Sequence, residues 1–328
     1  MSKLILHIGM HKTASTSIQD TFAKNQAYLN QHGLVYPRLG RGHHGLVTTW
    51  ISLPDHYSLN APAENHWRHI AKTQGPTNNT VLISTEEMSR GSIGSRVDFM
   101  TILNWTKAFD EIEIVCLVRD QLSLLQSIYF QVLPACPNLM WPHFLDQALS
   151  SNFATGVFLD YNDLLDFLLK NFQQRNIHFI PFRAAVKHPH GPAGALLDKI
   201  DFGSLATGMK FVNSNISEPP LPYWVASMIS RPGRPSAADI ALAQKMLSDR
   251  YGTAKSTIYS PAEAKRVTEK YAKPNSRFCG RVGSVPAATL TGGPAKAGLT
   301  FRNELDHSFW LEFIRARDAS TFPTRRPA

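Results

Sequence analysis

A short segment near the N-terminus, residues 4–22, constrains the fold of this chain more than any other part of the sequence. It begins with an apolar run at positions 4–8, which has the length of a buried strand. Gly9 and a loop around Lys12 follow, and apolar residues then recur at helical spacing as far as Gly33. This order predicts a phosphate-binding turn, because the first N–H groups of a helix lack intrahelical partners and the helix dipole favours an anion there.

The loop also carries polar groups suited to an anion. Lysine adds a full positive charge, and serine and threonine add hydroxyl donors. The residues predicted to contact phosphate are Lys12, Thr13, Ala14, Ser15, Thr16 and Ser17. An ordinary strand-to-helix turn is the alternative, because Ser and Thr also cap helices.

The loop differs from the Walker A sequence G-x-x-x-x-G-K-[ST]. Its lysine, Lys12, precedes Thr16 by four residues, and no Gly-Lys pair precedes the helix. This order argues against a magnesium–nucleotide site. A nucleotide-dependent kinase or NTPase on the same fold remains one alternative, and a non-catalytic protein that binds a phosphorylated ligand is another.

Residues 11–19, HKTASTSIQ, resemble the 5′-phosphosulfate loop of sulfotransferases that use 3′-phosphoadenosine 5′-phosphosulfate (PAPS). Bacterial members of that family often read HKTGTTSIQ. Ala14 stands where the family has glycine, and Ser15 stands where it has threonine. Serine keeps the hydroxyl group, whereas alanine fits only if the backbone at position 14 does not need a positive φ.

A second resemblance lies about a hundred residues further on. The apolar run 112–118 predicts a strand that ends at Arg119, and Ser127 lies eight residues later in an expected amphipathic helix. This pair resembles the 3′-phosphate site of PAPS enzymes, in which a guanidinium and a hydroxyl hold the phosphate. Asn215 lies in a segment similar to a late N-x-S segment of the family near the nucleotide. A strand-end charge, a surface serine and an Asn/Ser turn are the alternatives.

Three residues are candidate bases for the acceptor. His43 and His44 follow the first helix, in a region from which several sulfotransferases draw their base. Glu86 follows the expected strand 81–84, at the sheet edge where open α/β sheets bind ligands. Solvated histidines in a mobile loop and a helix N-terminal acid are the alternative interpretations.

Composition limits the possible classes. The chain has 328 residues and 43% hydrophobic content, which is enough for a large core. The net charge of +9 suits a polyanionic ligand, but the basic residues are dispersed, so we expect no nucleic-acid partner. Three cysteines without metal spacing, no apolar run of membrane-spanning length and no room for a signal peptide before the first strand predict a cytoplasmic protein.

Together these features predict a three-layer α/β/α fold with a central parallel sheet, the P-loop NTPase-like sulfotransferase fold, and a helical C-terminal part. We expect one domain over residues 1–328, with an acceptor-side insertion at 34–80 and a loose linker at 280–300 before a C-terminal helix. The resemblance implies metal-independent sulfuryl transfer from PAPS to a hydroxyl or, second, an amine. A glycan, glycolipid or small molecule would be the acceptor, and Lys12 would stabilise the leaving phosphate.

Overall fold

The computed structural model describes most of the chain, which divides into two compact units. The described residues are 1–92, 94–136, 138–214, 219–230, 233–252, 255–291 and 299–321. The first unit comprises 1–121, 150–216 and 271–291, and the second comprises 122–149, 217–270 and 292–328. The expectation that they form one domain stays a prediction.

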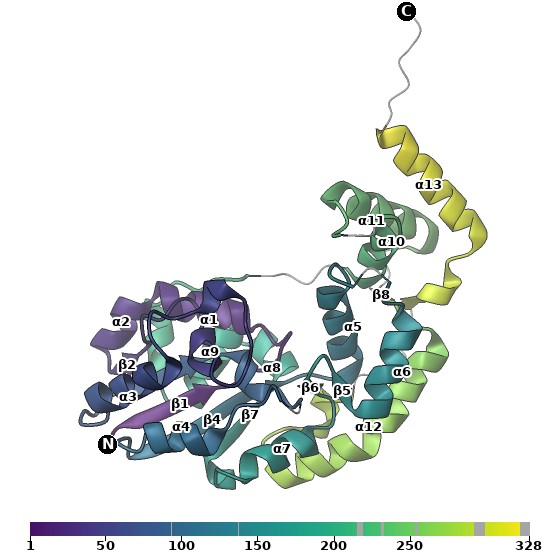
Figure 1. Ribbon diagram of the computed structural model, residues 1–328. Coiled ribbons are helices and arrows are strands. Elements are labelled where there is room, and N and C mark those ends of the chain that lie inside the picture. The colour runs from purple at the N-terminus through teal and green to yellow at the C-terminus, as the bar shows by residue number, and fades with distance from the viewer. Residues whose placement is uncertain are drawn as a thin grey trace, which may run out of the picture. The chain divides into compact units, whose positions relative to one another are not determined.

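The first unit is built on a five-stranded sheet in the order β2-β3-β1-β4-β7, and all its strand pairs are parallel (Figure 1). Its strands are β1 (Lys3–His7), β2 (Leu34–Val35), β3 (Thr80–Ser84), β4 (Glu111–Val118) and β7 (Ile177–Pro181). The central strands are buried apolar runs, as expected for a parallel sheet covered on both faces. The predicted α/β class with a central parallel sheet is therefore confirmed.

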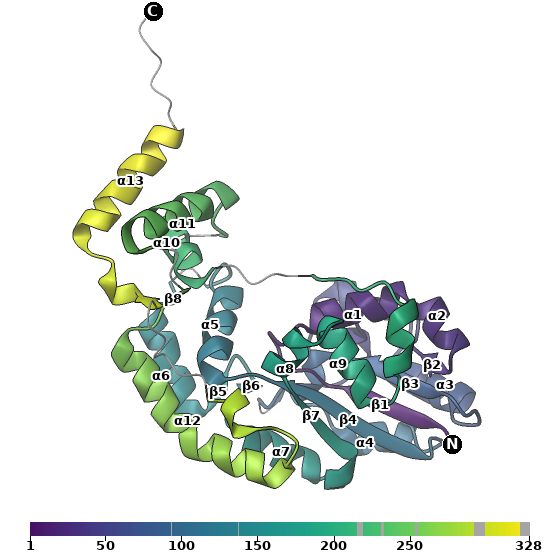
Figure 2. The same ribbon diagram turned by 180° about the vertical axis from the view of Figure 1, so that it is seen from behind.

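Helices cover both faces of this sheet (Figures 1 and 2). The first unit contains α1 (Ser15–Lys24), α2 (Gln26–Gln31), α3 (Ala63–Gln74), α4 (Phe99–Trp105), α7 (Tyr161–Leu169), α8 (Phe182–Lys187) and α9 (Gly191–Lys199). On the face of α1 and α9, Ile18 and Leu196 share one apolar core with Ile5 of β1. On the face of α3 and α4, Phe99 contacts Phe167 of α7 at 5.5 Å between ring centroids.

The helix expected to run from the loop to Gly33 is instead two helices, α1 and α2. Asn25 interrupts it, and its side-chain amide donates to the carbonyl groups of Thr21 at 2.7 Å and Lys210 at 2.8 Å. Its carbonyl oxygen accepts the N–H of Lys210 at 2.8 Å. The break therefore coincides with a contact between Asn25 and a segment that is distant in the sequence. The local spacing of apolar residues does not indicate such a contact.

The predicted insertion at 34–80 and the start of the predicted linker at 280–300 contain regular structure. The segment 34–80 supplies the edge strand β2 and the helix α3, together with 3₁₀ turns at His44–Val47 and Asp55–Tyr57. The expected linker 280–300 begins in α12 (Pro261–Val282) and buries Val285 and Leu290, while 292–298 lies outside the described residues. Val285 and Leu290 are therefore covered, whereas Pro286, Ala287 and Ala288 are exposed.

The second unit is mainly helical, in agreement with the expected helical C-terminal part. Its elements are α5 (Gln121–Val132, beginning at the last residue of the first unit's segment), α6 (Trp141–Ser151), α10 (Pro220–Ser230), α11 (Ala237–Tyr251), α13 (His307–Thr321), β8 (Lys255–Thr257) and β9 (Leu299–Phe301). The first unit also holds a small hairpin of β5 (Phe153–Ala154) and β6 (Val157–Phe158). Phe309 and Phe313 of α13 are buried, so this C-terminal helix packs through these two rings.

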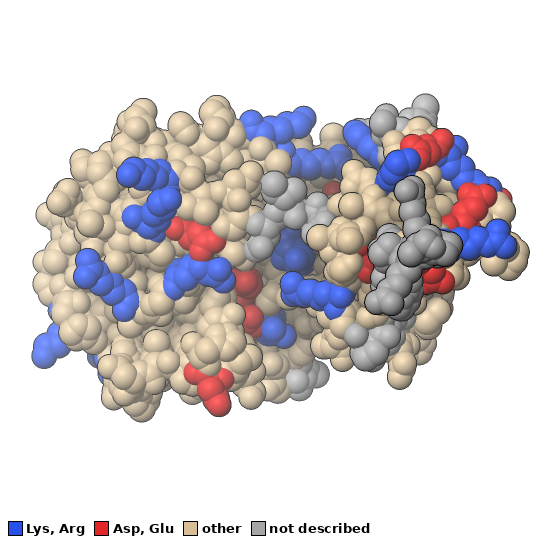
Figure 3. All heavy atoms as spheres, turned by 90° about the horizontal axis from the view of Figure 1, so that it is seen from above, with Lys and Arg blue, Asp and Glu red and all other residues tan. Residues whose placement is uncertain are grey.

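Surface charge is dispersed, as the sequence suggests. On the face drawn in Figure 3, Lys and Arg side chains are scattered and several lie close to Asp or Glu. Within the described residues, no helix is both long enough and apolar enough to cross a bilayer. The cysteines are free thiols: Cys116 and Cys279 are buried and Cys136 is exposed.

One carboxylate links three neighbouring strands. Glu113 of β4 lies 2.7 Å from Lys3 Nζ of β1 and 3.3 Å from His178 Nε2 of β7. The hydrogen bond from His178 and the charge of Lys3 lower the pKa of Glu113 to about 2, against the opposing effect of burial. Because this pKa is lower in the folded chain, the ionised group stabilises the fold above its usual pKa, and this stabilisation is lost as the pH falls towards 2.

We therefore expect Glu113→Gln to flatten the dependence of the free energy of unfolding on pH between about 4.5 and 2. Urea denaturation at a series of pH values would measure this. Glu64→Gln is the control, because Glu64 forms only an exposed pair with Arg68 in the same helix. Equal acid sensitivity of Glu113→Gln and the wild type would contradict the assignment.

Candidate active site

The loop between β1 and α1 has the backbone of an anion-binding turn. Lys12 and Ala14 both adopt left-handed conformations, with φ of 67° and 64°. Ser15, the next residue, begins α1. Left-handed residues next to a helix N-terminus are a backbone arrangement that can turn N–H groups towards an anion. The condition that position 14 avoid a positive φ is not met, so Ala14 occupies a conformation that suits glycine better.

The loop hydroxyls divide into two groups. Thr13 Oγ1 donates to the Met10 carbonyl at 2.6 Å. Ser17 Oγ donates to the Ser214 carbonyl at 2.7 Å and accepts its N–H at 3.0 Å, which ties α1 to that segment. Ser15 Oγ is buried without a hydrogen-bond partner among the described residues. Thr13 and Ser17 thus brace the site, whereas Ser15 keeps an unused hydroxyl beside the loop.

Arg119 lies against this loop. Its Nη1 donates to the Lys12 carbonyl at 2.8 Å, and its guanidinium lies 4.9 Å from the centre of the Phe182 ring. The Tyr161 hydroxyl donates to the Arg119 carbonyl. Burial lowers the pKa of Arg119, with Asp120 opposing the shift, but a guanidinium stays charged in proteins. The strand-end arginine and the loop lysine therefore belong to one connected site.

The other two predicted nucleotide contacts stay predictions. Ser127 belongs to the second unit, whereas Arg119 belongs to the first. Asn215 lies outside the described residues.

His43 serves as a buried cross-link. One ring nitrogen, Nδ1, accepts the N–H of Ser84 at 2.9 Å, and Nε2 lies 3.1 Å from the Pro37 carbonyl. The ring also packs on Tyr36, with 4.4 Å between centroids. Burial lowers the pKa of His43 to about 4. Both ring nitrogens are occupied, which leaves neither for an acceptor.

His44 occupies a different environment. Its Nδ1 lies 2.9 Å from Thr85 Oγ1, and its Nε2 lies 4.0 Å from Glu86 Oε2. Gln19 Nε2 donates to the same Glu86 oxygen at 2.9 Å. Burial would raise the pKa of Glu86, but His44, His11 and the hydrogen bonds outweigh it and the net shift is downward. His44 thus faces a carboxylate that remains ionised at neutral pH.

Two residues of the loop motif, His11 and Gln19, join this cluster although the sequence suggested no role for them. His11 Nε2 lies 3.8 Å from Glu87 and has no hydrogen-bond partner within the described chain. Burial lowers the pKa of His11, with Glu87 and Glu86 opposing the shift. Their presence within the matched motif was the only signal that pointed to them.

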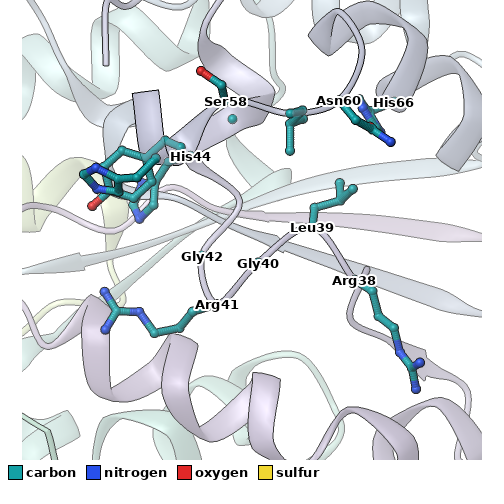
Figure 4. Close-up of a pocket in the computed structure, with 13 residues that line it drawn as sticks. Arg38, Leu39, Gly40, Arg41, Gly42, His44, Ser58, Asn60 and His66 are labelled. Carbon is teal, nitrogen blue, oxygen red and sulfur yellow. The ribbon is translucent and has the colours of Figure 1, made fainter. Parts of the chain in front are cut away.

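A pocket of about 540 Å³ adjoins this cluster (Figure 4). His44 forms one side of it, and His66 and Asn60 lie on another side. It is lined by Arg38, Leu39, Gly40, Arg41, Gly42, His44, Gly45, His56, Tyr57, Ser58, Leu59, Asn60 and His66. All these residues come from the segment 34–80, and they include the candidate base His44. That this segment is an acceptor-side insertion stays a prediction. Among the described residues, no group of three or more His, Cys, Asp or Glu is placed to hold a metal ion.

Comparison with known proteins does not assign a family. No family model matches the chain, and no curated protein sequence matches it. A sulfotransferase from Alicyclobacillus acidocaldarius is similar in structure at 11% identity and a TM-score of 0.48, over 87% of this chain and 97% of that chain. The sulfotransferase domain from the curacin biosynthetic pathway is similar at 16% identity and a TM-score of 0.35, over 82% and 96%. Function must therefore be argued from the site itself.

The left-handed Ala14 makes a specific prediction about stability. A non-glycine residue in this conformation costs about 1–2 kcal/mol, so Ala14→Gly should raise the free energy of unfolding by about 1 kcal/mol, net of the entropy of glycine. Chemical denaturation would measure the change. Ala23→Gly in the last turn of α1 is the control and should lower stability, by up to about 1 kcal/mol. Destabilisation by both substitutions would contradict the assigned backbone of the loop.

Proposed function

We propose that this protein is a sulfotransferase that transfers a sulfuryl group from PAPS to a hydroxyl group of an acceptor. The observation that carries the proposal is the position of Lys12 in a left-handed loop at the N-terminus of α1, where Gln19 of the same helix binds Glu86 beside His44. An anion site and a base beside a pocket are thus connected through one helix. This combination suits group transfer from an anionic donor, because it would hold the donor, stabilise the developing charge and place a base near the acceptor.

The donor phosphates would bind at the loop and at Arg119. The N–H groups at the start of α1, Lys12, and the hydroxyls of Ser15 and Thr16 would hold the 5′-phosphosulfate. The unpartnered Ser15 Oγ supports this fit. Arg119 would hold the 3′-phosphate while its contact with the Lys12 carbonyl steadies the loop. Ser127 and Asn215 would complete the nucleotide site.

The reaction would break the bond between sulfur and the phosphate oxygen and form a bond between sulfur and the acceptor oxygen. Lys12 would stabilise the negative charge that develops on the leaving phosphate. His44 would take the acceptor proton, because it lines the pocket and the Glu86 carboxylate lies 4.0 Å from its Nε2. Glu86 would stabilise the resulting imidazolium. In keeping with the resemblance, the proposed mechanism uses no metal.

The acceptor would bind in the pocket of the segment 34–80. Rings of His44, Tyr57 and His66 and the amide of Asn60 line it, which suits the apolar faces and hydroxyl groups of a sugar. A glycan or glycolipid is therefore the proposed acceptor class, with a small-molecule alcohol or an amine next.

The donor can be tested without knowing the acceptor. Adenosine 3′,5′-bisphosphate should stabilise the fold more than AMP, by about 2.7 kcal/mol over the free protein at a hundredfold excess over its dissociation constant. Arg119→Ala should remove most of the difference between the two ligands, because the 3′-phosphate loses its charged partner. Thermal shift with both nucleotides and with ATP–magnesium would measure these effects.

Arg183→Ala is the matched control, since Arg183 is half exposed and pairs with Asp120 at 3.6 Å. Equal shifts with AMP and the bisphosphate would argue against a PAPS donor. A larger shift with ATP–magnesium would favour the kinase alternative.

The base can be tested once a screen of glycans and glycolipids with PAPS yields an acceptor. His44→Ala should lower kcat by about 10²–10⁴ and remove the acidic limb of the pH–rate profile. His43→Ala should chiefly lower stability, because His43 connects Pro37 to Ser84 and has no free ring nitrogen. His69→Ala is the control, since His69 is exposed on α3 and is not among the residues that line the pocket. A folded His44→Ala variant with wild-type turnover would exclude His44 as the base.

A further inference from the structure

Gln19 is a buried polar residue that connects the donor helix to the acceptor side. Its side chain is 1% exposed and projects from α1, the helix that begins at the anion-binding loop. Its Nε2 donates to Glu86 Oε2 at 2.9 Å. Glu86 in turn follows β3, and the same carboxylate oxygen lies 4.0 Å from His44 Nε2.

The orientation of this amide is determined by its partner. An ionised carboxylate can only accept hydrogen bonds, so Gln19 must present its NH₂ group to Glu86. The carbonyl oxygen Oε1 then faces away and is buried without a hydrogen-bond partner among the described residues. An unpaired buried acceptor is unfavourable, and the structure tolerates it at the point where the Glu86 carboxylate is held.

Gly42, which lines the pocket, lies against the side chains of Gln19 and His44. A methyl group at position 42 would lie 2.7 Å from Gln19 Oε1 and 2.8 Å from His44 Nε2, which is closer than side-chain carbons pack. Figure 4 shows Gly42 on the loop beside His44. The absence of a side chain at Gly42 therefore lets the amide and the imidazole keep their places.

We infer that Gln19 is a positioning residue for sulfuryl transfer, which holds the Glu86 carboxylate opposite His44 and keeps it ionised while His44 carries the acceptor proton. The inference rests on the proposed function. Gln19 acts through Glu86 and His44, and its own atoms need not touch the acceptor. This role also accounts for the hydrogen bond between α1 and Glu86. Through this bond, one helix positions both the proposed donor loop and the proposed base.

The titration of Glu86 offers a readout that does not need activity. The Gln19 hydrogen bond contributes to the lowered pKa of Glu86, together with the charges of His44 and His11. Among the described residues, His7 and Tyr36 also interact with the charge of Glu86. Loss of the amide donor should raise the pKa of Glu86, and a second carboxylate at position 19 should raise it further.

The experiment compares the full-length wild type with Gln19→Met, Gln19→Glu and Gln74→Met. Gln74 is the matched control, since it lies at the end of α3 and binds Asn79. Carboxyl ¹³C NMR, with the Glu86 signal assigned by its loss in Glu86→Gln, would follow the titration. We expect a rise of about one pH unit in Gln19→Met, a larger rise in Gln19→Glu and none in Gln74→Met. With an acceptor, kcat should fall about tenfold or more in both Gln19 variants at an unchanged KM for PAPS.

Gly42→Ala, compared with Gly280→Ala, tests the same contact from the other side. A methyl group at Gly280 would meet no atom within 4 Å, so only the Gly42 variant should shift the Glu86 titration. Unchanged Glu86 titration in folded Gln19→Met would overturn the inference, and so would a shifted titration with wild-type kcat. A wild type that transfers no sulfuryl group would instead refute the proposed function, while the NMR result would still decide whether Gln19 holds Glu86.

Discussion

The site depends on a loop backbone that is unfavourable on its own. Two non-glycine residues, Lys12 and Ala14, are left-handed, and such residues persist only where the surroundings overdetermine them. Thr13 bonds to the Met10 carbonyl within the loop, and Arg119 of the neighbouring strand end bonds to the Lys12 carbonyl. The residue that would hold the donor's 3′-phosphate therefore also supports the loop for its 5′ end. The strained loop backbone and the charged side chain at the strand end therefore depend on each other.

The parallel sheet brings the remaining groups to the same edge. The Thr85 N–H donates to the His7 carbonyl at 3.1 Å, and the His43 N–H donates to the Ser84 carbonyl at 2.9 Å. The segment 34–80 is thereby folded back over the end of β3. As a result, the pocket wall lies beside the end of β3, next to the loop that follows β1. A single side chain, that of Gln19, then connects the helix after this loop to Glu86 after β3.

The sequence predicted the strands and the strand-loop-helix order well, because buried parallel strands are near-continuous apolar runs. It did not predict that Ser17 braces α1, since its partner Ser214 is 197 residues away. The Gly, Pro and His residues at 187–194 are typical of a loop, but α9 begins at Gly191, because Pro suits its first turn and its buried Leu196 and Leu197 hold it on the sheet. In each case a distant contact outweighed the local pattern.

The adjacent histidines show most clearly what a sequence leaves open. An extended loop would point their rings in opposite directions, but His44 begins a 3₁₀ turn and His43 precedes it. Burial keeps His43 neutral, because no carboxylate among its described neighbours offsets the cost of charging it. His44 has Glu86 at 4.0 Å and a pocket on its open side. Imidazole chemistry is the same at both positions, so the features that single out His44 as the proposed base are the neighbouring carboxylate and the adjoining pocket, and both are products of the fold.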